Sequence, residues 1–323
     1  MGKGIFVKGF LLAIFLSVGF VHAAEKVYVL ENPYMSRTLA VKDGVLSTQQ
    51  IVNKQAGTNL VPVSCQEFAL RISEGTDKEG TDRILTAKDF VVESVDKKFS
   101  SSIKSYRFRL KNKTHKLTVD VCYELAEDNF YGHKYLEITS GKKVTLEKID
   151  VESIAFEDAF QNYKLKLITA RKSGGWKPGL GQPVYTTATA TFWGMEFPGA
   201  FNTVEEGNTI TCGYLRGREL LPNERYTTYR SVVGMADDKN FIDDTFFCYI
   251  DRIRRRPARL QVQYNSWFDY GGRVSKETFA KSLRKVHDEL VVRRGCRPLN
   301  AYVIDDGWQD KGKRSRRPSG LRK

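Results

Sequence analysis

Two adjacent carboxylates near the end of the 323-residue chain are the side chains whose type and spacing most clearly suit chemistry. Asp305 and Asp306 directly follow the apolar residues 301–304, and Trp308 lies two positions further on. Carboxylates accept hydrogen bonds from sugar hydroxyls, and an indole covers the apolar face of a pyranose ring. The pattern therefore favours a monosaccharide pocket. Asp-Asp-Gly is also a frequent turn sequence, so a purely structural turn is the alternative.

The elements that must position these carboxylates form a strand–helix–strand pattern. Residues 260–265 predict a strand, and the loop that follows it contains Trp267. Ser275 stands where a helix N-cap is expected, and the predicted helix ends at Arg294, before Gly295. The apolar stripe of this helix has helical spacing and consists of Phe279, Leu283, Val286 and Leu290.

The second strand of this pattern, residues 301–304, is almost wholly apolar, which is typical of a parallel strand covered on both faces. Polar residues at its carboxyl end match a (β/α)₈ barrel, whose chemistry lies at that end. A doubly wound sheet could begin in the same way, but no glycine-rich phosphate-binding turn follows residues 260–265. Trp308 and Trp267 are then candidates for the wall of one pocket, with packing at the barrel mouth as the alternative for Trp267.

The preceding region, from Lys26 to about Ile253, predicts short strands and turns throughout. Residues 105–110 and 117–121 alternate apolar and polar side chains and read as a hairpin. Further turns that reverse the chain tightly are expected at Asp43-Gly44 and Ser140-Gly141. Many short antiparallel strands with one wet face predict a β-sandwich, so the fold class is mainly β with one βαβ unit at its end.

Two further tryptophans lie in this β region. The stretch 174–183 is dense in Gly and Pro and predicts an irregular excursion from the sandwich, with a linker as the alternative. Its Trp176 either packs locally or turns to a sugar. Trp193 lies beside Gly194 in strand-like sequence, where packing in the core is the expected role.

The first residues have the features of a secretory signal peptide. Lys3 and Lys8 precede the apolar residues 10–20, and small residues follow, with cleavage expected after Ala23. Residues 1–23 therefore predict a secreted or periplasmic protein without a stable membrane span after cleavage. An uncleaved anchor is the alternative, although the run is short for a span.

Charge and cysteines exclude several function classes. Residues 311–323 contain seven basic residues and no acid, so half of the formal net charge of +14 comes from this tail. The remaining excess does not call for a nucleic-acid partner. The five cysteines are scattered without the paired spacing of structural zinc, and we expect neither a metal nor a cofactor. Cys122, in a strand-like stretch, is expected to be buried.

Two sequence motifs resemble those of one enzyme family. The run Val303-Ile304-Asp305-Asp306-Gly307-Trp308, preceded by Tyr264-Asn265-Ser266-Trp267, resembles the first two barrel strands of glycoside hydrolase family 36, the α-galactosidases and their relatives. The stretch Trp193-Gly194-Met195-Glu196-Phe197-Pro198 is similar to one found late in that family's N-terminal β-supersandwich. The resemblance covers the chain up to Asp310.

The resemblance implies a substrate and roles for four residues. Asp305 and Asp306 would hold the axial O4 and the O6 of galactose, with Trp308 and Trp267 as wall residues. The family's retaining mechanism uses a nucleophile and an acid/base about 5 Å apart. Both are expected after later barrel strands, so this chain would hold the N-terminal portion only, have no catalytic residue and be inactive. α-N-Acetylgalactosaminidases of the same clan are the main substrate variant.

The expected organisation is a signal peptide (1–23), a β-supersandwich (24–256), the start of a truncated (β/α)₈ barrel (257–310) and an aberrant basic tail (311–323). A frameshift or premature stop would explain the tail, and a disordered basic extension is the alternative. The expected partner is an α-galactoside oligosaccharide or glycan; the oligomeric state does not follow from the sequence. Two competing functions are a secreted carbohydrate-binding sandwich without catalysis and an exported structural protein whose tail binds anionic surfaces.

Overall fold

The computed structural model describes residues 25–74, 82–163, 181–257 and 259–308. The predicted signal peptide, Trp176 and the basic tail lie outside these residues. The chain divides into two compact units, Met1–Ile253 and Arg254–Lys323. Among the described residues, no helix has the length and apolar character that a membrane crossing requires.

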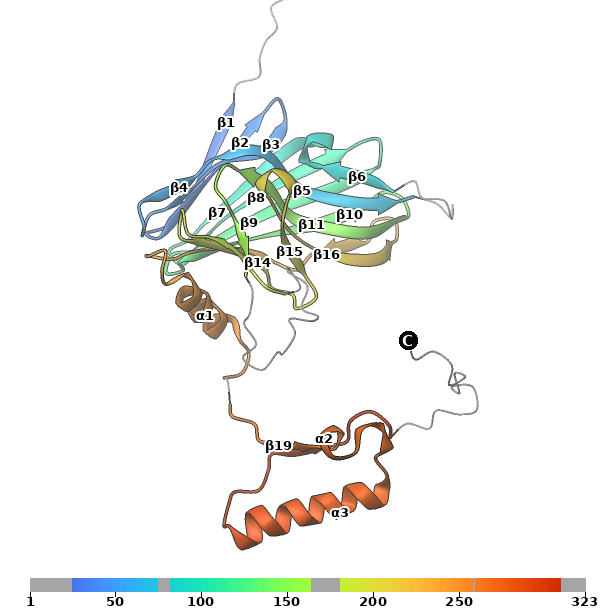
Figure 1. Ribbon diagram of the computed structural model, residues 1–323. Coiled ribbons are helices and arrows are strands. Elements are labelled where there is room, and N and C mark those ends of the chain that lie inside the picture. Colours follow the sequence, from blue (N-terminus) through green and yellow to red (C-terminus); the bar gives the residue numbers. More distant parts are fainter. Residues whose placement is uncertain (1–24, 75–81, 164–180, 258, 309–323) are drawn as a thin grey trace, which may run out of the picture. The chain divides into compact units, whose positions relative to one another are not determined.

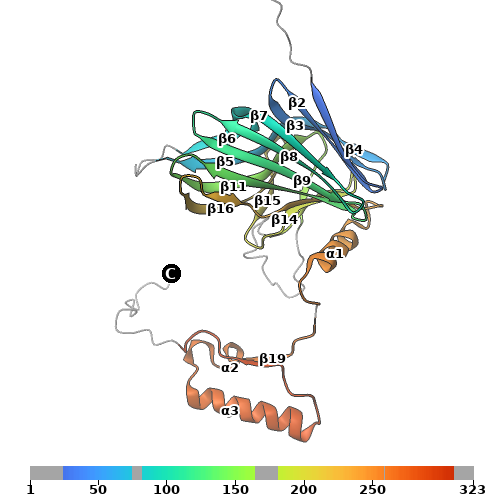
Figure 2. The same cartoon turned by 180° about the vertical axis from the view of Figure 1, so that it is seen from behind.

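The first unit is a β-sandwich built from three antiparallel sheets (Figures 1 and 2). The four-stranded sheet has the order β1 (Lys26–Glu31), β2 (Met35–Lys42), β3 (Val45–Asn53) and β4 (Thr58–Leu60). The five-stranded sheet has the order β15 (Phe201–Glu205), β16 (Thr209–Leu220), β11 (Val144–Phe156), β5 (Pro62–Ser73) and β6 (Arg83–Thr86).

The nine-stranded sheet has the order β12 (Gln161–Asn162), β13 (Val184–Thr186), β14 (Thr191–Met195), β18 (Ser231–Met235), β10 (Tyr131–Ser140), β9 (Leu117–Ala126), β8 (Ile103–Asn112) and β7 (Val91–Phe99), and β17 (Arg225–Thr227) also pairs with β10. Two short 3₁₀ turns are η1 (Ala87–Asp89) and η2 (Glu206–Asn208). The three sheets share one hydrophobic core, to which Leu39, Phe68 and Val121 each contribute a fully buried side chain from a different sheet.

Two of the predicted hairpins are confirmed. β8 and β9 pair in antiparallel register from Ile103 with Ala126 to Asn112 with Leu117. β2 and β3 are joined at Asp43-Gly44, where φ is 52° and 80°. Positive φ at both turn positions is the backbone of the tight hairpin turn that matches strand twist. Cys122 is buried on β9, as expected.

The hairpin predicted at Ser140-Gly141 is wrong. β10 pairs with β9, β17 and β18, whereas β11 pairs with β5 and β16, so the turn carries the chain from one sheet into another. Both edges of each strand are already occupied by other partners. Local turn residues therefore indicated a change of direction but not the partner of the next strand.

The expectation that the first unit contains only strands is also wrong at its end. Helix α1 (Ile242–Ile253) packs through Ile242 and Tyr249, both buried, against Phe192 of β14. Asp243 and Asp244 lie in its first turn, where acidic side chains favour a helix N-terminus. The helical spacing of Ile242, Phe246 and Tyr249, four and three positions apart, is the sequence signal for this helix.

The second unit contains the predicted strand–helix–strand pattern. β19 (Gln263–Asn265) and β20 (Ala301–Val303) pair in parallel, and α3 (Lys276–His287) lies between them in sequence. The short helix α2 (Trp267–Tyr270) and the 3₁₀ turn η3 (Gly271–Arg273) follow β19. Ser275 caps α3 as predicted, because its hydroxyl accepts a hydrogen bond from the Thr278 amide.

Three details of this unit differ from the predictions. The first strand is shorter than residues 260–265, since Leu260 is 86% exposed and only three residues pair with β20. The helix ends at Arg293 instead of Arg294, and its last part, η4 (Asp288–Arg293), is π-helical. β20 is half-buried rather than covered on both faces. Within the described residues, this small sheet has only two strands to shield it.

Candidate functional site

The parallel register of β19 and β20 brings their carboxyl ends to the same edge. Asn265, the last residue of β19, is paired with Val303, the last residue of β20. The next residues are locked together: the Ser266 amide donates to the Val303 carbonyl at 3.1 Å, and the Asp305 amide donates to the Ser266 hydroxyl at 3.0 Å. Ser266 is fully buried. The four predicted site residues all follow these two strand ends within a few positions.

Asp305 is held by partners on both of its oxygens. The Asn265 amide donates to Asp305 Oδ2 at 2.8 Å, and the Asp306 main-chain N–H donates to Oδ1 at 2.7 Å. The Asn265 hydrogen bond and then the Asp306 hydrogen bond keep the pKa of Asp305 below its ordinary value. Asp305 is therefore an ionised acceptor with a fixed direction.

Asp306 is more open than Asp305. Its Oδ1 accepts the Gly307 amide at 2.8 Å, and the residue is exposed. Gly307 has a φ of 104°, and a Cβ there would lie 2.4 Å from the Gly272 carbonyl oxygen. Only glycine fits this close approach of the loop after β20 to the loop after β19. The two loops that carry the predicted residues are thus in direct contact.

Both tryptophans of the predicted site present surface to solvent. Trp267 is 48% exposed and Trp308 is 65% exposed, and Phe268 beside Trp267 is 88% exposed. Exposed aromatic side chains next to carboxylate acceptors are available to contact a ligand. The Trp267 amide donates to Asn265 Oδ1 at 2.8 Å, which ties the start of its helix to the strand end.

The loop after β19 is anchored at two further points. The Tyr264 hydroxyl donates to Asp269 Oδ2 at 2.6 Å, and the Tyr270 hydroxyl lies 2.7 Å from Ser282 Oγ of α3. Helix α3 therefore holds the loop against the small sheet. The side chains at the strand ends are presented by a fixed rather than a free loop.

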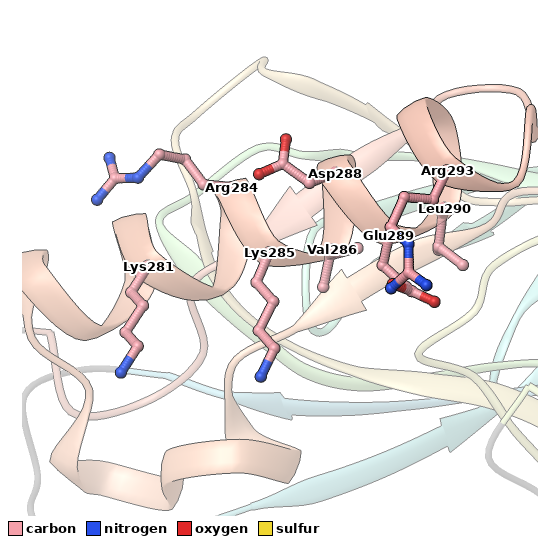
Figure 3. A pocket seen from close by; sticks show the side chains of 8 residues that line it. All are labelled: Lys281, Arg284, Lys285, Val286, Asp288, Glu289, Leu290 and Arg293. Atoms are coloured by element: carbon pink, nitrogen blue, oxygen red, sulfur yellow. The ribbon is translucent and has the colours of Figure 1, made fainter.

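A hollow on α3 and η4 contains none of the predicted site residues. Figure 3 shows its lining along α3 and η4: Lys281, Arg284, Lys285, Val286, Asp288, Glu289, Leu290 and Arg293. Apart from the ion pair between Arg293 and Glu289, the charged side chains in Figure 3 point in different directions from the helix. The strand ends, where acceptors and aromatic rings lie on neighbouring elements, are the better candidate.

Asn265 and Ser266 belong to the motif at residues 264–267, but the sequence pattern predicted no role for either. A cluster of charges inside the sandwich was not predicted either. Arg37 of β2 forms two hydrogen bonds with Glu152 of β11, at 2.8 and 3.1 Å. Lys134 of β10 contacts Glu67 of β5 at 2.7 Å and Glu152 at 3.1 Å. Lys134 shares its strand face with Leu136 and Ile138, a signal that could have revealed the cluster.

This cluster is completely buried and neutral in sum. Glu67 also accepts from the hydroxyls of Thr48, at 2.5 Å, and Tyr123, at 2.6 Å. Burial alone would raise the pKa of Glu67, but Lys134 and Arg37 outweigh it and hold the pKa well below its ordinary value. Glu67 also has a φ of 59°, which is unusual for a non-glycine residue. Because it is saturated with partners, the cluster supports the fold rather than a ligand.

The stretch around Trp193 is part of the packing of the first unit. Trp193 is fully buried against Phe156, as expected for a core residue. Glu196 accepts from the Tyr249 hydroxyl and lies 2.9 Å from His133 Nε2, so it joins α1 to the sheet. Burial opposes ionisation of Glu196, but His133 and Tyr249 together keep its pKa below the ordinary value.

Comparison with known proteins identifies similar folds. No protein-family model matches the chain, and no curated protein matches it. The galactosidase domain of the α-galactosidase–sucrose kinase AgaSK aligns with a TM-score of 0.56 at 14% identity, over 89% of this chain and 51% of that chain. The family 36 α-galactosidase AgaB of Geobacillus stearothermophilus aligns with a TM-score of 0.54 at 12% identity, over 88% and 50%.

A third solved structure agrees. The α-galactosidase of Lactobacillus brevis aligns with a TM-score of 0.51 at 10% identity, over 87% of this chain and 48% of that chain. The chain thus spans about half the length of the proteins it is similar to. At these identities the likeness concerns the fold, and it confirms the mainly β architecture predicted from the sequence. Over about half of their length, this chain shares the fold of the family 36 α-galactosidases.

Proposed function

We propose that this chain carries the sugar-binding front half of an exported glycoside hydrolase of the α-galactosidase type. One observation carries the proposal: Asp305 and Asp306 present carboxylate oxygens after β20, where this strand end is joined to the end of β19, and exposed aromatic residues follow both strands. The ligand is a terminal α-linked galactose. Its hydroxyls donate to the two carboxylates, and Trp308 and Trp267 cover the apolar face of its ring.

The βαβ unit is, in this proposal, the first part of a (β/α)₈ barrel. Leu260 and Ile304 are 86% and 45% exposed, and further barrel elements would cover such apolar side chains. Retaining hydrolysis requires two carboxylates about 5 Å apart on opposite sides of the bond. In this proposal Asp305 and Asp306 both serve binding and neither is the nucleophile or the acid/base, and we propose binding without cleavage.

The test is calorimetric titration of the full chain with methyl α-galactoside, beside a turnover assay with an aryl α-galactoside. We expect saturable binding and no turnover, and we expect the double variant Asp305→Ala/Asp306→Ala to lose binding. Asp288→Ala, an exposed acid on η4, is the matched control and should bind normally. Absence of binding by the unmodified chain contradicts the proposal, and turnover contradicts its non-catalytic part.

N-Acetylgalactosamine is the second sugar to titrate. It differs from galactose at C2, whereas the two carboxylates are proposed to bind O4 and O6, so equal affinity for both sugars is expected.

A carbohydrate-binding role of the sandwich is the competing function. In the described part of the sandwich, tryptophan occurs only at the fully buried Trp193, which disfavours a stacking site there. Binding that survives in the double variant would instead favour the sandwich.

A further inference from the structure

The side chain of Asn265 makes hydrogen bonds to both halves of the candidate site. Its side-chain N–H donates to Asp305 Oδ2 at 2.8 Å, and its side-chain oxygen accepts the Trp267 amide at 2.8 Å. One amide group therefore fixes a carboxylate after β20 and an aromatic residue after β19. An amide suits this place because it supplies a donor and an acceptor at once.

We propose that Asn265 is the positioning residue of the sugar site, which sets the direction of the Asp305 carboxylate and the start of the Trp267 helix together. The inference rests on the proposed function for its ligand. Asn265 touches no sugar in this proposal and acts through its two partners. The same hydrogen bond is the largest cause of the lowered pKa of Asp305, so loss of the Asn265 side chain has a measurable consequence at Asp305.

Groups other than the Asn265 side chain already hold the two strands together. Its main chain already pairs with Val303 in the sheet register, and Ser266 joins the strands one residue later through the amides of Ser266 and Asp305. The side chain of Asn265 is thus not needed to close the sheet. Its two hydrogen bonds go instead to the residues that face the proposed ligand.

Asn300 provides a matched control at the opposite end of the same two strands. Its side-chain oxygen accepts the Val262 amide at 2.9 Å, so Asn300→Ala also removes a side-chain hydrogen bond between these segments. Asn300 makes no described contact with Asp305 or Trp267. General loosening of the unit therefore affects both variants, whereas positioning affects only Asn265 variants.

The experiment measures the Asp305 pKa by carboxyl NMR titration of the full chain, together with affinity for methyl α-galactoside. Asn265→Ala should raise the Asp305 pKa toward its ordinary value and weaken binding about tenfold, the loss of one aligned hydrogen bond. Asn265→Asp keeps the acceptor for Trp267 but removes the donor and adds a like charge. It should raise the Asp305 pKa further and leave the Trp267 amide signal in place.

The outcomes separate this inference from the proposed function. If the unmodified chain binds no galactoside, the proposed function fails, and the pKa of Asp305 still decides whether Asn265 positions it. An unchanged Asp305 pKa in Asn265→Ala overturns the inference even when binding is strong. Equal loss of affinity in Asn265→Ala and Asn300→Ala overturns it as well, because that result indicates loosening without positioning.

Discussion

The two units of this chain both gather carboxylates, but they use them in opposite ways. In the sandwich, Glu67 and Glu152 are buried, and their oxygens are taken by two cations and by the hydroxyls of Thr48, Tyr123 and Ser231. In the second unit, Asp305 is partly exposed and Asp306 is exposed, and only amide N–H groups occupy them. Both units contain charged carboxylates, but only those of the second unit have oxygens that can accept further hydrogen bonds.

The difference shows what separates a structural charge cluster from a binding site. The sandwich cluster takes Arg37 from the four-stranded sheet, Glu67 and Glu152 from the five-stranded sheet, and Lys134 from the nine-stranded sheet. Such a network favours this arrangement of the three sheets, because separating the partners would leave a charge unpaired in the core. The open carboxylates make no comparable contribution to packing and are available to hydroxyl donors.

Removing one partner from the buried charge cluster of the sandwich should have the largest effect on stability. Glu67→Gln leaves Arg37 and Lys134 with one carboxylate, and an uncompensated buried charge costs about 3–5 kcal/mol of unfolding free energy. Urea unfolding measures the change. Glu219→Gln, whose partner Lys143 is on the surface, is the control and should change stability by less than about 1 kcal/mol. Equal effects at the two positions contradict a structural role for the cluster.

The open carboxylates should show the reverse pattern. Asp306→Ala removes an acceptor proposed to bind a hydroxyl, so affinity for methyl α-galactoside should fall by about 1.5–3 kcal/mol. Stability should stay within about 0.5 kcal/mol, as for other exposed substitutions. Calorimetric binding and urea unfolding on the same sample give both values. A large loss of stability without loss of affinity would assign Asp306 to the fold.

The glycine contact between the two loops gives a smaller and more local effect. Gly307→Ala forces a Cβ against the Gly272 carbonyl and holds alanine at a φ of 104°, a strain of about 1–3 kcal/mol. The loops should separate and sugar affinity should fall. Gly271→Ala is the control, since its φ is also positive, at 54°, but a Cβ there meets no atom within 4 Å. Calorimetry that finds the same affinity in both variants excludes the loop contact as a requirement.

Local sequence signals predicted much of this structure because they report directly on local geometry. Asp43-Gly44 permits positive φ at two positions, and Ser275 supplies a cap, so both were found. The partner of β10 was not found, because a turn such as Ser140-Gly141 looks the same whether the next strand joins the same sheet or another. Long-range pairing is set by which strand edges remain free, and the sequence near the turn carries no such information.

In the candidate site, too, the residues with a local sequence signal were predicted, and those that depend on long-range contacts were not. Asp305 and Asp306 attracted attention through their type and their place after an apolar strand. Asn265 did not, because its importance depends on the register that places it beside Asp305 from 40 positions away. The charge cluster of the sandwich escaped notice for the same reason: Arg37 and Glu152 are 115 positions apart and meet only once the sheets are assembled.

Asp150 of β11 is an intermediate case that sharpens the comparison. It is buried, with 7% of its surface exposed, and Lys148 contacts its Oδ2 at 3.0 Å, but its Oδ1 has no hydrogen-bond partner within the described residues. Burial, the largest cause, raises the pKa of Asp150 although Lys148 acts against it. A buried carboxylate with an unsatisfied oxygen should therefore weaken the sandwich at neutral pH.

The sign of its pH dependence is opposite to that of Glu67. A carboxyl with a raised folded-state pKa contributes most stability below its unfolded pKa and loses that contribution as pH rises. Asp150→Asn should therefore gain stability relative to the unmodified chain between pH 3 and pH 7. Glu67, whose folded-state pKa is lowered, stabilises the fold above its unfolded pKa. The stability of Glu67→Gln should therefore fall relative to that of the unmodified chain as the pH rises over the same interval. Unfolding free energies at several pH values test both slopes, and parallel slopes would show that partner saturation does not distinguish these two buried carboxylates.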